Sequence, residues 1–203
     1  MKKILIVCLF FITSVWSQAQ NPKVVADCTV SFDVIIDGAS KSPSTKTLYI
    51  RGVETRTDLV NSNFVQTTFY NSKTETAVIL REIGGNKYMT TLSAEQWKAQ
   101  NKRYEGMEVV LTDESKTILG YYCKKAQLKL KDGSTLNVYY ATGITPSASE
   151  NNYQFKGVPG FPLEYETAGE NGKGNVKFTA TRINLNPVPA SRFEIPQSGY
   201  RIL

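Results

Sequence analysis

Histidine is absent from this 203-residue chain, which carries 24 Lys and Arg against 18 Asp and Glu. Its absence excludes Ser-His-Asp and Cys-His catalysis and removes the most common general base and metal ligand. Any catalysis would have to rely on carboxylates, lysine, tyrosine or cysteine. We therefore expect a protein that is not an enzyme.

Clustered metal ligands are also lacking. The chain has three cysteines, with no zinc-type spacing, and no alternating Asp/Asn run that ends in Glu as a calcium loop does. We expect no metal and no cofactor. With 41% apolar and 21% charged residues, 14 Gly, 8 Pro and no internal repeat, the composition suits a single globular domain and excludes collagen-like, coiled-coil and low-complexity chains.

The first residues have the pattern of a secretory signal peptide. Lys2 and Lys3 precede an apolar run that continues to Trp16, and Ser17-Gln18-Ala19 places small residues before a cut after Ala19. The run is shorter than the roughly 20 apolar residues of a membrane span. We predict a signal peptide over 1–19 and a single β-rich domain over 20–203, exported to the periplasm or envelope, with an extracellular location left open.

Cleavage there would remove Cys8, two lysines and no acidic residue, leaving a net charge of +4. A charge this mild does not imply nucleic-acid binding, although Lys125, Lys129 and Lys131 line one face of an expected strand. The two remaining cysteines, Cys28 and Cys123, would meet an oxidising compartment, where an even count favours pairing. They are a candidate disulfide.

Most of the chain has a β pattern. From Ala26 to Ile36 apolar and polar residues alternate strictly, as in a half-buried antiparallel strand. Further strands are expected over 47–58, 64–70, 76–83, 87–92, 107–111, 117–131, 135–141 and 177–185, with a loop over 141–162 and a hairpin tip at 169–174. The absence of intervening helices predicts a meandering antiparallel sheet.

One helix interrupts the strands. Ser93 and Gln96 form a capping-box pattern, Leu92 and Trp97 a hydrophobic staple, and the helix is expected over 94–104. Trp97 and Tyr104 lie seven residues apart on one face, which favours packing on the sheet over a ligand site.

Face alternation makes two finer predictions. Residues 126–130 and 136–140 face one core only if the loop between them has an odd number of residues, expected as Asp132-Gly133-Ser134. A β-bulge at Lys124-Lys125 would turn Cys123 toward the core that holds Cys28. We expect the paired carboxylates Glu164 and Glu166, and Asp113 and Glu114, to be exposed rather than catalytic.

Three segments carry a family resemblance: 118–126 (ILGYYCKKA), 138–144 (VYYATGI) and 155–164 (FKGVPGFPLE). They resemble the exported bacterial family named for a Gly-Leu-Pro-Gly-Leu-Ile motif, and more closely an uncharacterised relative of it. The motif here consists of Gly157, Val158, Pro159, Gly160, Phe161 and Pro162. The resemblance implies export and no established activity.

A weaker resemblance, of architecture only, is to periplasmic lipoprotein carriers of the LolA/LolB kind. It implies a half-barrel of curved antiparallel sheet, with helix packed against it, around an apolar cavity. The physical role of the motif is open between a loop that anchors on the sheet and a rigid rim over a ligand.

Two functions remain open. The first is binding of an apolar or lipid-like molecule on the concave face, with candidate residues Phe32, Val34, Tyr122, Leu128 and Tyr140. The alternative is a structural or interaction module that binds another envelope protein through a sheet edge or the 157–163 loop. The alternative predicts a filled core.

Overall fold

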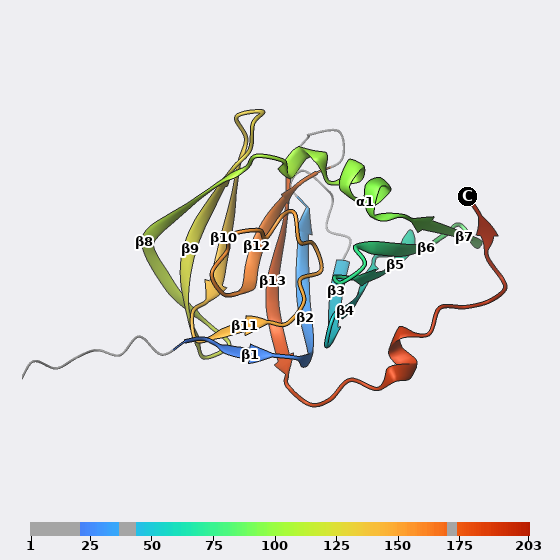
Figure 1. Ribbon diagram of the computed structural model, residues 1–203, viewed down its shortest axis with the longest axis horizontal. Helices are drawn as coiled ribbons and strands as arrows, with labels where there is room; N and C mark the ends of the chain where they lie inside the picture. Colours follow the sequence, from blue (N-terminus) through green and yellow to red (C-terminus); the bar gives the residue numbers. More distant parts are fainter. Residues whose placement is uncertain (1–20, 37–43, 170–173) are drawn as a thin grey trace, which may run out of the picture.

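The computed structural model describes residues 21–36, 44–169 and 174–203. The signal peptide predicted over 1–19 lies outside these residues, as does most of the hairpin tip. The described chain forms one strongly curved sheet of twelve strands with one α-helix on its concave side (Figure 1). The predicted fold class, a mainly β half-barrel of antiparallel meander with one main helix, is confirmed.

The elements follow one another as β1 (Lys23–Val25), β2 (Asp27–Ile36), β3 (Ser44–Arg51), β4 (Glu54–Val60), β5 (Phe64–Asn71), β6 (Thr76–Ile83), β7 (Asn86–Leu92), α1 (Ala94–Gln100), the 3-10 helix η1 (Lys102–Tyr104), β8 (Glu108–Ile118), β9 (Tyr121–Lys129), β10 (Thr135–Ala141), β11 (Ile144–Pro146), β12 (Phe161–Ala168), β13 (Asn175–Asn184), the 3-10 helix η3 (Ala190–Phe193) and β14 (Arg201–Ile202).

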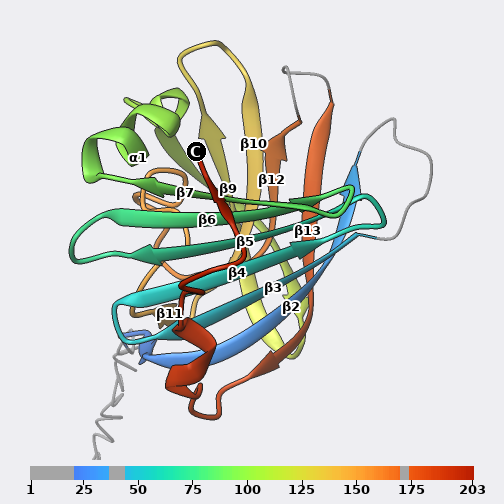
Figure 2. The same cartoon turned by 90° about the vertical axis from the view of Figure 1, so that its right-hand side faces the viewer.

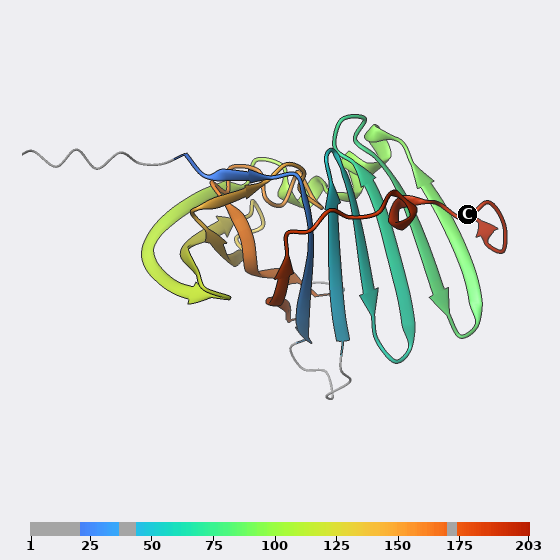
Figure 3. The same ribbon diagram turned by 90° about the horizontal axis from the view of Figure 1, so that it is seen from below.

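Two meanders build the sheet. Strands β2 to β7 pair in chain order, and β8, β9, β10, β12 and β13 form the second meander, which joins the first where β13 pairs with β2. The curvature of the joined sheet is clearest from below (Figure 3). Strands β1 and β11 form a separate parallel pair. The long segment between β11 and β12 covers the concave face.

Strand β2 confirms the alternation expected from sequence over 28–34: Cys28, Val30, Phe32 and Val34 are all buried. Ala26 and Ile36, expected on the same face, are exposed. The single strand expected over 47–58 is wrong. The chain instead turns at Gly52, which has a positive φ of 60°, and β3 and β4 form a hairpin. The inward residues of β4 include Thr55 and Thr57, so hydrophobicity does not mark the second strand.

The strand expected over 117–131 also contains a turn. Leu119 and Gly120 have φ values of 52° and 82° and make a two-residue connection between β8 and β9. Cys123 and Ala126 of β9 are both fully buried although they are three residues apart, so the strand changes which alternate residues face the core between them. The bulge predicted at Lys124-Lys125 is nevertheless wrong for the pairing with β10, which is uninterrupted along β9. The register shifts lie in the flanking strands, between Leu111 and Ser115 of β8 and beside Tyr140 in the β10–β12 pair. An edge strand such as β8 accommodates extra residues easily because one side is unpaired.

The hairpin of β9 and β10 has the shared inward face that we predicted, but its register differs by two residues. Leu128 lies opposite Leu136 rather than Val138. An even shift leaves every side chain on its predicted face.

The helix begins as predicted. The Ser93 hydroxyl accepts from the Gln96 N–H at 3.3 Å, and the Gln96 side chain accepts from the Ser93 N–H at 2.8 Å. Trp97 packs against the concave face, with its ring stacked on Tyr70 at a centroid distance of 5.2 Å. The α-helix ends at Gln100, short of the expected 104, and η1 directs Tyr104 to the main core instead.

The convex face of the first meander is covered by the C-terminal tail (Figure 2). Ile195 and Tyr200 pack there on Phe69, Leu80 and Met89. The concave and convex faces are therefore both packed, by different segments.

Replacing Leu119 by Asn is expected to stabilise the protein. Leu119 has a left-handed backbone conformation, which costs an L-residue other than Asn, Asp or Gly about 1–2 kcal/mol. We expect the midpoint of urea unfolding to rise for Leu119→Asn. Leu119→Ala keeps the strain and serves as the control; an equal gain in both variants would contradict this explanation.

Candidate binding groove

Residues 150–155 fill the concave face of the sheet, and we call them the plug. The plug has no strand pairing; its side chains hold it instead. Asn151 donates to Asn101 at 2.7 Å, Asn152 to the Tyr70 hydroxyl at 2.9 Å, and Gln154 to the backbone carbonyl of Glu166 at 3.0 Å. The plug is therefore tied to α1, to β5 and to β12.

Glu150 makes the deepest contacts of the plug. Its carboxylate lies 2.5 Å from the Lys46 ammonium of β3, with side-chain exposures of 11% and 7%. It also accepts from the Tyr165 hydroxyl at 2.7 Å and from Thr57 at 3.1 Å. A buried charge is tolerated only when it is paired and hydrogen-bonded. Lys46 and Glu150 are paired with each other, and each also has hydrogen-bond partners.

Phe155 completes the seal. Its ring meets Tyr165 edge-on at a centroid distance of 4.9 Å, and Tyr165 in turn stacks on Phe178 at 4.9 Å. The space left between Phe155, Phe161 and Leu48 has a volume of about 10 Å³. A space of that size holds at most one water molecule.

The five residues predicted to bind an apolar ligand do not form a common open surface. Phe32, Val34, Leu128 and Tyr140 are buried in the core, whereas Tyr122 is 54% exposed. Tyr122 lies next to buried Cys123 in β9 and so points away from the core. None of the five is among the residues that line the groove described below.

The predicted loop motif lies at the end of the covering segment. Gly157 has a φ of 85°, and a Cβ on Gly160 would lie 2.2 Å from the Ala141 carbonyl oxygen. Phe161 is buried at the start of β12, Pro162 pairs with Tyr140, and Pro159 is exposed. These contacts show the motif anchored on β10.

The candidate disulfide is absent. Cys28 and Cys123 are both fully buried in the same core cluster, as the face prediction required, but both are free cysteines.

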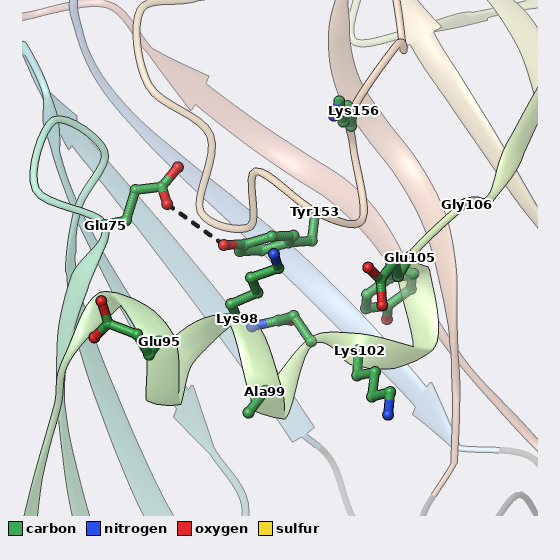
Figure 4. Close-up of a pocket in the computed structure, with 11 residues that line it drawn as sticks. Glu75, Glu95, Lys98, Ala99, Lys102, Glu105, Gly106, Tyr153 and Lys156 are labelled. Carbon is green, nitrogen blue, oxygen red and sulfur yellow. Dashed lines mark hydrogen bonds between the residues drawn. The ribbon is translucent and has the colours of Figure 1, made fainter.

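A groove opens at the rim of the plug, between it and the helical segment α1–η1 (Figure 4). Its volume is about 570 Å³. The lining comes from the β5–β6 turn, from α1 and η1, and from the plug and the residue after it: Glu75, Glu95, Lys98, Ala99, Asn101, Lys102, Tyr104, Glu105, Gly106, Tyr153 and Lys156.

Charges of both signs lie along the groove. Glu75 and Glu95 are at one end, Lys102, Glu105 and Lys156 are toward the other, and Lys98 reaches Tyr153 between them (Figure 4). The Tyr153 hydroxyl donates to Glu75 at 3.4 Å. Burial and the Glu75 carboxylate raise the pKa of Tyr153, so this hydroxyl stays protonated and remains a donor.

Sequence reasoning missed the groove and the plug. The sequence feature that corresponds to the plug is the polar run from Glu150 to Gln154, within a segment whose composition is typical of a loop. Each of these side chains has a partner on a different element, and a polar side chain becomes buried only under that condition.

A second polar cluster lies on the convex face. Glu164, expected to be exposed, is only 8% exposed and binds Lys116 at 2.7 Å and Lys177 at 2.9 Å. Burial raises the pKa of Glu164, but the hydrogen bonds and charges of the two lysines outweigh it and lower the pKa below its usual value. The described residues contain no group of side chains suited to a metal ion. Across the same residues no helix is long and apolar enough to span a membrane.

No family model and no curated protein matches the chain. The resemblance to the Gly-Leu-Pro-Gly-Leu-Ile family therefore stays a prediction. Solved structures are similar in fold. An uncharacterized conserved protein from Thermus thermophilus is 8% identical, with a TM-score of 0.52 over 88% of this chain and 90% of its own.

Two further structures are more distant. PNGF-II is 17% identical with a TM-score of 0.46, and the match covers 87% of this chain but 30% of PNGF-II, so the chain spans less than a third of its length. A LolA superfamily protein from Nitrosomonas europaea is 11% identical with a TM-score of 0.39, over 84% of this chain and 91% of its own.

Glycine at position 160 is expected to be essential for the covering segment. Gly160→Ala would push a methyl group against the β10 backbone and cost about 1–3 kcal/mol of unfolding free energy. Gly143→Ala is the matched control, because nothing lies within 4 Å of its Cβ position. Equal stability of the two variants in urea unfolding would contradict the anchoring role.

Glu164 is expected to make the free energy of unfolding fall at acidic pH. Its pKa is lowered in the folded protein, so its stabilisation is complete above the usual carboxyl pKa of 4.5 and is lost as the pH falls through the folded value. Wild type should therefore lose more stability between neutral and acidic pH than Glu164→Gln. Identical pH profiles from thermal unfolding would show that the two lysines do not act on this carboxylate.

Proposed function

We propose that the chain is an exported binding module without catalytic activity, and that its groove holds an extended segment of another envelope protein. One observation supports this more than any other. The concave apolar face is filled by the plug, whereas the groove beside it is open and lined by charges of both signs.

The partner segment is defined by complementarity. Basic side chains would face Glu75 and Glu95, and acidic ones would face Lys102 and Lys156. The tyrosines of the groove, Tyr104 and Tyr153, offer ring surface with a polar tip, the kind of residue enriched in protein interfaces. The predicted signal peptide supports the envelope location of both proteins.

Site-specific photo-cross-linking in the native host, or a close relative, tests this function. A photoreactive residue replaces Ala99, which lines the groove and is exposed, and in the control replaces Ala190 of η3, which is exposed outside it. We expect one discrete cross-linked protein from position 99 and none from position 190. A bound lipid in the purified protein, with no protein cross-link, would contradict the proposal and favour an apolar ligand beneath the plug.

Charge reversal in the groove is expected to weaken binding of that partner. Lys98→Glu with Lys102→Glu should lower its affinity by about tenfold or more, because the complementary charges become repulsive. The matched control reverses two exposed lysines of β9, Lys124→Glu with Lys129→Glu. If both double variants bound equally, the lysines of the groove would not contact the partner.

A further inference from the structure

A primary amine and a carboxyl group are held together between β3 and the plug, away from solvent. The Lys46 Nζ lies 2.5 Å from a Glu150 carboxylate oxygen, and both side chains are almost completely buried. The two residues come from β3 and from the plug, far apart in the chain.

Aromatic rings enclose the pair. The Lys46 Nζ lies 4.7 Å from the ring centroid of Phe178, 4.9 Å from Tyr165 and 5.5 Å from Phe32. The Tyr165 hydroxyl contacts both reacting groups: it accepts from Lys46 and donates to Glu150. Thr57 donates to the other carboxylate oxygen at 3.1 Å.

This arrangement has the parts of an acyl-transfer site. A lysine in an apolar pocket becomes nucleophilic when it loses its proton, and burial does lower the pKa of Lys46, against the opposing effect of Glu150. The carboxyl carbon is the electrophile, and the Tyr165 hydroxyl can pass a proton between the two groups. Fixed contact of this kind gives intramolecular reactions effective concentrations of about 10⁵ M or more.

We propose that Lys46 and Glu150 condense into an amide cross-link that fastens the plug to β3 covalently. The ammonium first gives one proton to the carboxylate, which leaves an amine and a carboxylic acid. The Nζ lone pair then forms a bond to the Glu150 Cδ. A second proton leaves Nζ through the Tyr165 hydroxyl, and the Cδ–O bond breaks to release one water molecule. No oxidant, reductant or cofactor is needed.

The cross-link would stabilise the fold covalently, which no disulfide between Cys28 and Cys123 does. Cys28 and Cys123 are free, whereas an amide between two distant residues removes chain entropy from the unfolded state, as a disulfide does. It would also prevent the plug from leaving the concave face.

Mass spectrometry of the purified wild-type protein tests the proposal. Its intact mass should be lower than the mass of its processed sequence by one water molecule. Trypsin cannot cleave after an acylated lysine, so the digest should contain residues 42–51 joined to residues 132–156. Fragmentation would place the link between Lys46 and Glu150.

Two variants and one reagent complete the test. Lys46→Arg keeps the positive charge and should restore the full mass, and Tyr165→Phe should slow the reaction by about 100-fold by removing the proton carrier. Succinimides at Asp37-Gly38 or Asp132-Gly133 also lose water, but hydroxylamine opens them and leaves the amide intact, and they join no peptides.

Recovery of Lys46 and Glu150 in separate, unmodified peptides from folded wild-type protein would overturn the proposal. A dehydrated protein in which hydroxylamine converts the whole modification to a hydroxamate, with no joined peptides, would overturn it as well. The wild-type measurement does not depend on whether any variant folds, nor on what the groove binds.

Discussion

The contact between Lys46 and Glu150 is the interaction on which this architecture depends. Twelve strands curve around a concave face, and a short irregular segment fills it. That segment has no backbone ladder with the sheet. It is held by one buried ion pair, supported by Tyr165 and Thr57, and by a series of single hydrogen bonds from Asn151, Asn152 and Gln154. Losing the Glu150 carboxylate would leave a buried lysine without its partner, which costs about 3–5 kcal/mol.

The position of the plug also sets where a ligand can bind. The apolar side chains of β2, β12 and β13 are covered by Glu150 and Phe155, so the face that a carrier would offer to a lipid is occupied by the chain itself. An opening at the rim, where the plug faces α1 and η1, is lined by side chains of both charges. The plug thus closes one site and forms one wall of another. Our proposal of an interaction module in preference to an apolar carrier rests on this arrangement.

Local patterns in the sequence predicted local structure well. The alternation in β2 and the capping box at Ser93 reflect neighbouring residues, and both are confirmed. The hairpins at Gly52 and at Leu119-Gly120 were missed for different reasons. In β4 the inward positions nearest the turn, Thr55 and Thr57, are threonines. At position 119 a leucine occupies a backbone conformation that usually marks Asn or Gly.

The candidate site was not predictable in the same way. Hydropathy places a run such as Glu150–Gln154 on the surface, because an isolated polar group is costly to bury. Its burial depends on partners in β3, β5, β12 and α1, which only the folded chain brings together. Tyr122 shows the converse, since an aromatic residue in a β-prone run was expected inside and lies outside.

Hydrogen exchange of the plug tests the central claim most directly. If Glu150 holds the plug, backbone amides over 150–155 exchange slowly in the wild type and become selectively faster in Glu150→Ala, while β2 and β3 keep their protection. Lys156→Ala, one residue beyond the plug, exposed and outside the ion pair, should leave the pattern unchanged. Fast exchange of the plug in the wild type, or equal exchange in Glu150→Ala, would show that the concave face is not sealed by this contact.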